Sequence, residues 1–261
     1  MSSAAPQALF LGTGTSTGVP LIGCGCPVCS SPDQRNNRTR SSIYISHEGF
    51  GLLIDTSPDF RLQALRASIP RIDAVLITHA HADHIFGMDD LRRFNTIQGM
   101  RIPVFAAHHT LGLLARIFYY FFESALPGSY RPQIDFEPLS GRTRIGPFSV
   151  TPFEVEHGLD LTMGYRLDVG GHSLAYAPDC IRFPRKSLEV VDGVGTMVLD
   201  ALRYRPHVSH MTVEQSVKVL QTINAPVSYI THLGHDLDYA TVAEELPAGI
   251  YPAYDGLRFL W

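Results

Sequence analysis

The stretch His79-Ala80-His81-Ala82-Asp83-His84 places three imidazoles and one carboxylate within six residues. It directly follows the apolar run of residues 74–77, which contains Val and Ile and predicts a buried strand. Because His79 and His81 are two residues apart, an extended segment projects both rings to one side. Asp83 and His84 come after the turn and can point elsewhere. One loop at the end of a strand can therefore supply ligands to two neighbouring metal ions.

Three further polar side chains follow predicted strands later in the chain. His157, Asp179 and His232 each stand directly after a run rich in β-branched or aromatic residues. A single histidine in such a place is usually only a hydrogen-bonded loop residue. Together with the opening cluster, however, the three complete a set of about seven nitrogen and oxygen ligands without sulfur. Such a set suits zinc, manganese or iron.

The His-x-His-x-Asp-His pattern resembles the signature of the metallo-β-lactamase-fold hydrolases. The resemblance implies a four-layer αββα sandwich with a dinuclear metal site at its edge. Mixed strand and helix patterns in both halves, with no linker between them, indicate a single domain over residues 1–261. The resemblance also implies how the ligands divide between two divalent ions, zinc or manganese. The first ion is held by His79, His81 and His157, and the second by Asp83, His84 and His232, with Asp179 bridging both.

Three cysteines are crowded into Cys24-Gly25-Cys26-Pro27-Val28-Cys29. A structural zinc needs four ligands, and His235, three residues beyond His232, is the candidate for the fourth. Spacing alone leaves this open. The loop resembles that of the phosphoribosyl 1,2-cyclic phosphate phosphodiesterase branch, in which a Cys-x-Cys-x-x-Cys loop is completed by such a histidine. The resemblance therefore implies a structural zinc loop at residues 23–30. We expect the fourth cysteine, Cys180, to be a packed thiol.

A further histidine is needed for catalysis rather than for metal binding. Expulsion of an alkoxide requires a proton, and general acid help of this kind is worth roughly 10²–10⁴-fold. In the same phosphodiesterase branch a non-ligand histidine lies about as far before the last metal ligand as His210 does here. The resemblance thus assigns His210 to catalysis, together with the ligand Asp83. His207 is the alternative to His210.

The remaining polar residues carry weaker signals. Arg38 and Arg40 could contact phosphate, but an arginine in a loop is usually a solvated charge. We expect ordinary structural roles for the other histidines considered, which are His47, His108, His109 and His172.

Composition limits the possible partners and location. The net charge of -4 argues against a nucleic-acid-binding surface. No apolar stretch reaches the ~20 residues that a membrane span needs, and the first residues do not resemble a signal peptide. With clustered thiols, these features predict a cytoplasmic protein without a membrane partner. Residues 110–122 predict an apolar, aromatic-rich helix, which is either buried or part of a homodimer interface.

These observations favour a metal-dependent phosphodiesterase that cleaves a small or cyclic phosphate diester, ribosyl or nucleotide-like, by attack of a metal-bridging hydroxide. Two other enzymes of the same superfamily remain as alternatives. One is a thioester or lactone hydrolase of the glyoxalase II type, and the other is an RNA-processing endonuclease. A scaffold that merely retains an old metal site is disfavoured, because decayed sites usually lose ligands.

Overall fold

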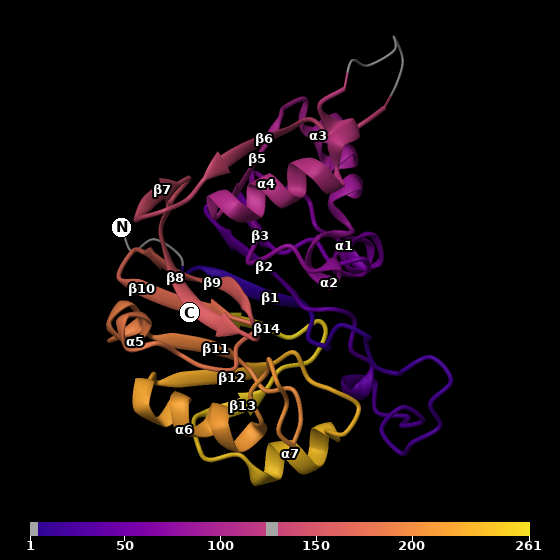
Figure 1. The fold of residues 1–261 in the computed structure, drawn as a ribbon, viewed down its shortest axis with the longest axis vertical. Helices are drawn as coiled ribbons and strands as arrows, with labels where there is room; N and C mark the ends of the chain where they lie inside the picture. Colours follow the sequence, from indigo (N-terminus) through magenta and orange to yellow (C-terminus); the bar gives the residue numbers. More distant parts are fainter. Residues whose placement is uncertain (1–4, 124–129) are drawn as a thin grey trace.

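Two β-sheets pack face to face in the computed structural model of this chain, which describes residues 5–123 and 130–261. Each sheet has seven strands among these residues (Figure 1). The first runs, in spatial order, β14 (Arg258–Leu260), β1 (Gln7–Gly12), β2 (Ser42–His47), β3 (Phe50–Ile54), β4 (Ala74–Leu76), β5 (Ile102–Ala106) and β6 (Ile134–Pro138). The second runs β13 (Ile250–Pro252), β12 (Val227–Thr231), β11 (Thr196–Asp200), β10 (His172–Ala177), β9 (Asp160–Val169), β8 (Phe148–His157) and β7 (Thr143–Ile145).

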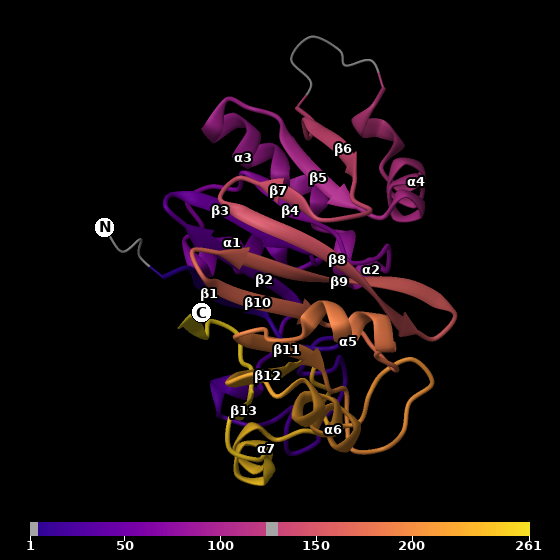
Figure 2. The same cartoon turned by 90° about the vertical axis from the view of Figure 1, so that its left-hand side faces the viewer.

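Helices cover the outer face of each sheet, as Figures 1 and 2 show. The first sheet is covered by α1 (Phe60–Ala67), α2 (Ala82–Ile85), the 3₁₀ turn η2 (Met88–Asp90), α3 (Leu91–Gln98), α4 (His108–Ile117) and the 3₁₀ turn η3 (Tyr119–Phe121). The second is covered by α5 (Arg185–Val191), α6 (Val213–Ile223) and α7 (Tyr239–Glu245). A further 3₁₀ turn, η1 (Gln34–Asn36), lies in the long loop after β1. The expected αββα sandwich is therefore confirmed.

Strand β1 shows why the layers form. Side chains alternate across a strand, so Ala8 and Phe10 enter the apolar layer between the two sheets. Leu9 and Leu11 instead enter the layer beneath the helices. Because both faces are covered, the strand is a continuous apolar run rather than an alternating one.

In both sheets, the carboxyl ends of the parallel strands lie at the same edge of the sandwich. Strands β3, β4, β5 and β6 are mutually parallel, as are β10, β11, β12 and β13. The segments that follow the carboxyl ends of parallel strands lie side by side, which is where such sheets build binding sites.

Two helical stretches of the first layer are interrupted. Residues 82–98 are divided into α2, η2 and α3. The backbone at Gly87 approaches Ser57 so closely that a Cβ there would lie 2.1 Å from the Ser57 carbonyl oxygen. The helix predicted over residues 110–122 ends at Ile117 and continues as η3.

The aromatic segment after α4 is only partly buried. Phe118 and Phe121 pack beneath the first helical layer, whereas Tyr119 is 62% and Phe122 52% exposed. The segment is therefore partly buried and partly exposed, because a short turn exposes side chains on both of its sides.

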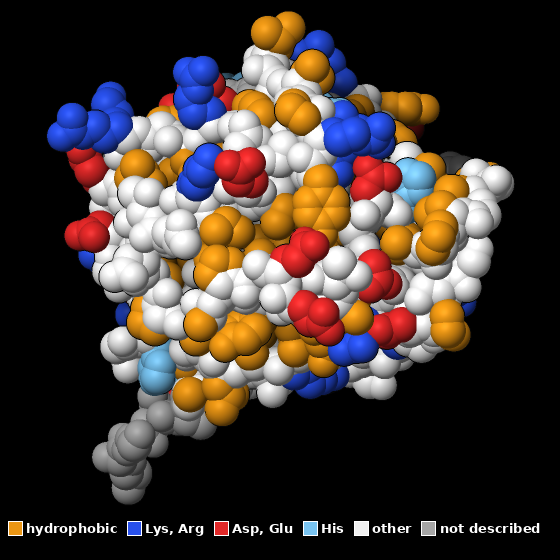
Figure 3. Space-filling view, turned by 90° about the horizontal axis from the view of Figure 1, so that it is seen from below, with side chains coloured by type: hydrophobic (Ala, Val, Ile, Leu, Met, Phe, Trp, Pro, Cys, Tyr) orange, Lys and Arg blue, Asp and Glu red, His pale blue; other side chains and the backbone are white. Residues whose placement is uncertain are grey.

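Within the described residues, no helix combines the length and apolarity required to cross a bilayer. On the face seen in Figure 3, acidic and basic side chains both occur among apolar ones.

Candidate metal centre

The opening cluster lies where β4 gives way to α2. His81 precedes α2 with extended backbone angles, and Asp83 and His84 lie in the first turn of the helix. His79 and His81 are thus on the extended part and the other two ligands on the helical part, as the spacing predicted. Asp83 and His84 are buried, while His81 is exposed. The centre is therefore open to solvent on the His81 side.

The first group of predicted ligands comes together from two segments. Nε2 of His79 lies 2.9 Å from Nδ1 of His81, and Nε2 of His157 lies 3.3 Å from the same Nδ1. Nδ1 of His79 is 3.0 Å from the hydroxyl of Thr78, and Nδ1 of His157 is 2.8 Å from the carbonyl oxygen of Ser209. These outer contacts hold both rings with Nε2 facing the centre.

The second group is built around two carboxylates. Nε2 of His84 lies 3.3 Å from Oδ2 of Asp83, and Nε2 of His232 lies 3.6 Å from the same oxygen. Asp179 lies between the two groups. Its Oδ1 is 3.2 Å from Nε2 of His84, and its Oδ2 is 3.8 Å from Nε2 of His79 and 3.7 Å from Nε2 of His157. The predicted bridging position thus lies within reach of both groups.

Burial and charge perturb these groups strongly. Burial raises the pKa of Asp179, but the imidazoles of His232 and His84 outweigh burial and hold this pKa well below its usual value. Burial lowers the pKa of His84, yet the surrounding carboxylates, Asp179 foremost, raise it well above its usual value. Negative charge is therefore concentrated around His84. A bound divalent cation would neutralise that charge.

Several buried atoms of this centre lack a hydrogen-bond partner in the part of the chain that the structure describes and are therefore suited to bind a cation. Among the described residues, Nε2 of His84, Nε2 of His232 and Oδ1 of Asp179 are buried without a hydrogen-bond partner. Unpaired buried polar atoms are costly and rare. All three belong to the second group of predicted ligands, so this group has the atom types and the unpaired atoms that binding of a divalent ion requires.

His232 also adopts a left-handed backbone, with φ of 61°, the kind of strain found at functional sites.

Two carboxylates that the sequence interpretation missed support the ligands from behind. Oδ2 of Asp55, after β3, lies 2.7 Å from Nδ1 of His84, and the Thr78 backbone N–H donates to the other oxygen of this carboxylate. Asp200, the last residue of β11, accepts from the backbone N–H of Cys180. Both are completely buried and follow parallel strands. Their position at a strand end is the one signal in the sequence that either residue carries.

His210 has the geometry of an oriented acid. Its Nδ1 lies 2.9 Å from Oδ2 of Asp200, and its Nε2 lies 4.0 Å from Oδ2 of Asp179. The ring stacks on that of His232 at 4.6 Å. Burial lowers the pKa of His210, and Asp179 opposes this. His207, the alternative, lies farther out, with Nδ1 3.2 Å from the Ser209 hydroxyl.

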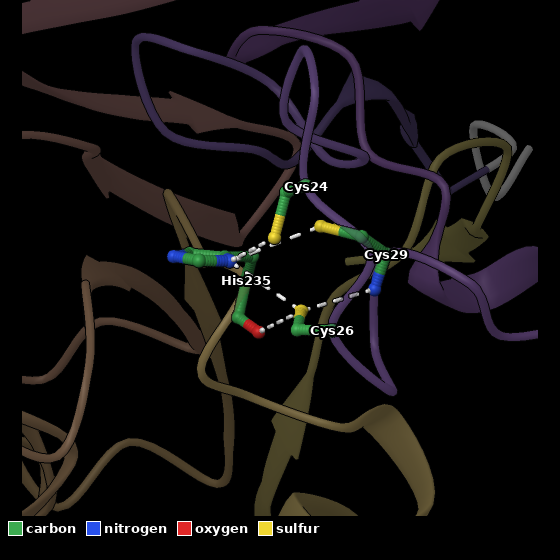
Figure 4. Close-up of side chains that lie close together, drawn as sticks. All are labelled: Cys24, Cys26, Cys29 and His235. Carbon is green, nitrogen blue, oxygen red and sulfur yellow. Dashed lines mark hydrogen bonds between the residues drawn. The ribbon is translucent and has the colours of Figure 1, made fainter.

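The three clustered cysteines converge on His235 (Figure 4). Its Nδ1 lies 3.5 Å from Sγ of Cys24, 3.5 Å from Sγ of Cys26 and 3.8 Å from Sγ of Cys29. A tetrahedral zinc with ordinary Zn–S and Zn–N bonds separates such atoms by ~3.6 Å. The backbone N–H of Cys29 lowers the pKa of Cys26 to about 6, which favours the thiolate. Cys180 is buried away from this cluster, as expected for a packed thiol.

Arg38 corrects one expectation. Instead of a solvated charge it is a buried side chain, 1% exposed. Its guanidinium donates to the carbonyl oxygens of Gly234 and Leu237 and to the Asn36 side chain. It therefore anchors the turn that carries both His232 and His235. Arg40 lies nearer the surface and pairs with Asp59.

Of the histidines expected to have structural roles, His109 lies unexpectedly close to the centre. It begins α4, directly after β5, and lines one pocket with the ligands His79 and His81. His172 is exposed at the start of β10, the opposite end of that strand from Asp179.

Comparison with known proteins identifies relatives. A family model described as a Beta-lactamase superfamily domain matches residues 51–233. The solved structure of a diphosphatase from the PhnP family is 38% identical, with a TM-score of 0.90 over 98% of both chains.

Two curated proteins carry other names. An octanoyltransferase of Porphyromonas gingivalis is 36% identical in an alignment of 264 residues, which covers 97% of this chain but 51% of that protein. This chain thus spans about half the length of that relative. A coenzyme PQQ synthesis protein B of Methylobacterium nodulans is 30% identical over 217 residues, covering 74% of this chain and 72% of that protein.

Proposed function

This chain belongs to the β-lactamase superfamily and is a hydrolase of the metallo-β-lactamase fold, and on that premise we propose that it is a phosphodiesterase acting on a small or cyclic phosphate diester. The observation that carries the proposal is His210, which is held by Asp200 and faces the ligand Asp179. Cleavage of a diester expels an alkoxide, which needs a proton. Thioester cleavage expels a thiolate, whose conjugate acid has a pKa near 8.5, and therefore needs less help.

We propose two divalent ions, zinc or manganese, at the centre and a structural zinc at the cysteine cluster. Two such ions would lower the pKa of water toward ~7 and neutralise charge on the phosphoryl oxygens. The ligand sets are those assigned from the sequence. The first is His79, His81 and His157, the second is Asp83, His84 and His232, Asp179 is shared, and the structural set is Cys24, Cys26, Cys29 and His235.

Other residues of the chain would donate a proton to the leaving group and orient the proposed ligands. His210 donates the proton on Nε2 to the leaving oxygen, while Nδ1–H donates to Asp200 and fixes the ring. Asp55 accepts from Nδ1 of His84, which keeps Nε2 of that ring available as a ligand. The Thr78 hydroxyl and the Ser209 carbonyl orient His79 and His157 in the same way.

The names of the relatives favour this proposal unequally. The diphosphatase is 38% identical and matches 98% of both chains, and its name describes cleavage of a diphosphate. Cleavage of a diphosphate is therefore the second candidate, since it requires the same attack with a different leaving group. The octanoyltransferase is about twice as long as this chain, so its name does not assign acyl transfer to the matching half.

The test is a substrate panel. The protein, purified with added manganese or zinc, is assayed with bis(4-nitrophenyl) phosphate, 4-nitrophenyl phosphate, a dinucleoside diphosphate and an acyl thioester. We expect diester turnover well above monoester and thioester turnover. Diphosphate turnover far above the rest would favour the second candidate, and dominant thioester turnover would overturn both. Metal analysis should find about three ions per chain, one of which resists mild chelation.

A further inference from the structure

The exposed side of the metal centre opens into a pocket of about 280 Å³. One wall is formed by the ligands His79 and His81. The opposite wall comes from the first turns of α4 and from the turn between β8 and β9, and its side chains are His109, Thr110, Leu113 and Leu159. Figure 2 shows this β8–β9 turn projecting beyond the neighbouring strand β10. The pocket is thus continuous with the place where a phosphate would bind.

Two leucines in this pocket are exposed although they adjoin a polar centre. Leu113 is 41% exposed, and Leu159, at the tip of the turn, is fully exposed. Single exposed leucines are ordinary, but these two line the same cavity. His109 adds a flat ring to the wall, and its Nε2 lies 3.3 Å from the hydroxyl of the buried Thr110, which restricts its orientation. The wall is therefore mainly apolar with one oriented polar ring.

We propose that this pocket binds the organic group carried by the phosphate and that it selects a flat, mostly apolar ring over a short alkyl group. The volume lies just below the ~300–1,000 Å³ of small-molecule sites, which suits one ring system rather than a polymer. The two leucines contact the ring edge-on or face-on, and the His109 imidazole stacks on it. This inference rests on the proposed function, because it assumes that a phosphate group occupies the adjoining metal centre.

The test compares two compounds that cannot be hydrolysed and differ only in this group. Phenylphosphonate and methylphosphonate carry the same charged head, and their Kd values for the metal-loaded protein are measured by calorimetry. We expect phenylphosphonate to bind about tenfold tighter or more, as burial of one ring predicts. Leu159→Ser and Leu113→Ser should each reduce this preference without changing the Kd of methylphosphonate. The matched control is Leu65→Ser, an exposed leucine on α1 that does not line the pocket.

The outcomes separate this inference from the proposed function. Equal Kd values for the two phosphonates, or equal weakening of both by the leucine variants, would overturn the pocket assignment alone. If neither phosphonate binds a fully metal-loaded protein that hydrolyses a thioester, the phosphodiesterase proposal falls as well. Metal content and circular dichroism of each variant show whether the centre and the fold are intact. A preference that is lost in Leu159→Ser and kept in Leu65→Ser supports the assignment.

Discussion

Replacing His210 with alanine tests whether this residue donates a proton or binds a metal ion. The ring contacts Asp200 through Nδ1, at 2.9 Å, and presents Nε2 to the centre, 4.0 Å from Asp179. The seven proposed ligands are all other residues, so His210→Ala should leave the metal content unchanged. Asp200 keeps its backbone donors at Cys180 and Met211, which preserves the local fold.

The expected loss depends on the leaving group. For a ribose alkoxide, as in adenosine 2′,3′-cyclic phosphate, we expect kcat to fall by roughly 10²–10⁴-fold. This equals about 2.7–5.4 kcal/mol of lost transition-state stabilisation. For the weakly basic 4-nitrophenolate, the loss should be much smaller, because that group leaves without a proton.

The assay measures kcat for both substrates in the wild type, in His210→Ala and in a matched control. His172→Ala is that control, since it removes an exposed imidazole at the far end of β10. Metal content is measured on the same samples. Loss of a metal ion from His210→Ala would show that His210 is a ligand. An equal loss of kcat for both leaving groups would refute the assignment as an acid.

Three further substitutions test the surroundings of the metals. Cys26→Ser should lower the zinc content by one ion per chain and leave the other ions in place; unchanged zinc would remove the structural site. Asp55→Asn loses the charged partner of His84 and should weaken metal affinity by about 10–100-fold in a chelator competition, without changing the fold. Arg38→Met leaves buried carbonyls unpaired and should lower stability by about 3 kcal/mol in thermal unfolding, whereas Arg40→Met, nearer the surface, should cost about 1 kcal/mol or less. Equal melting temperatures for the two arginine variants would contradict the anchoring role.

The candidate metal ligands could be predicted from sequence because their signal is local. Each of His79, His157 and His232 lies at or just after the end of a recognisable strand. Strand ends are visible as the point where a β-branched run meets polar residues. The resemblance to a known signature then linked segments that spacing alone could not join. The same local reasoning predicted the cysteine loop and nominated His235, whose ring lies at the three sulfurs.

Residues that act through long-range contacts were not identified. Asp55 also follows a strand, but a single carboxylate has no pattern that marks it, and its partner His84 is 29 residues away. Arg38 contacts carbonyls 196 and 199 residues distant, so nothing near it in the chain distinguishes it from a solvated arginine. His109 reaches the centre only because β5 lies beside β4.

The sequence by itself determined the candidate ligand types, because these side chains lie within a few residues of strand ends. The resemblance to a known signature implied the layered fold and the proposed division of the ligands between two metals. Only the tertiary structure decided which groups orient those ligands and what lies beside them. The reason is the order of strands in the two sheets, which brings the ends of β3, β4 and β5 together with those of β10, β11 and β12. That order places Asp55 behind His84, Asp200 behind His210 and a leucine-lined pocket beside His81.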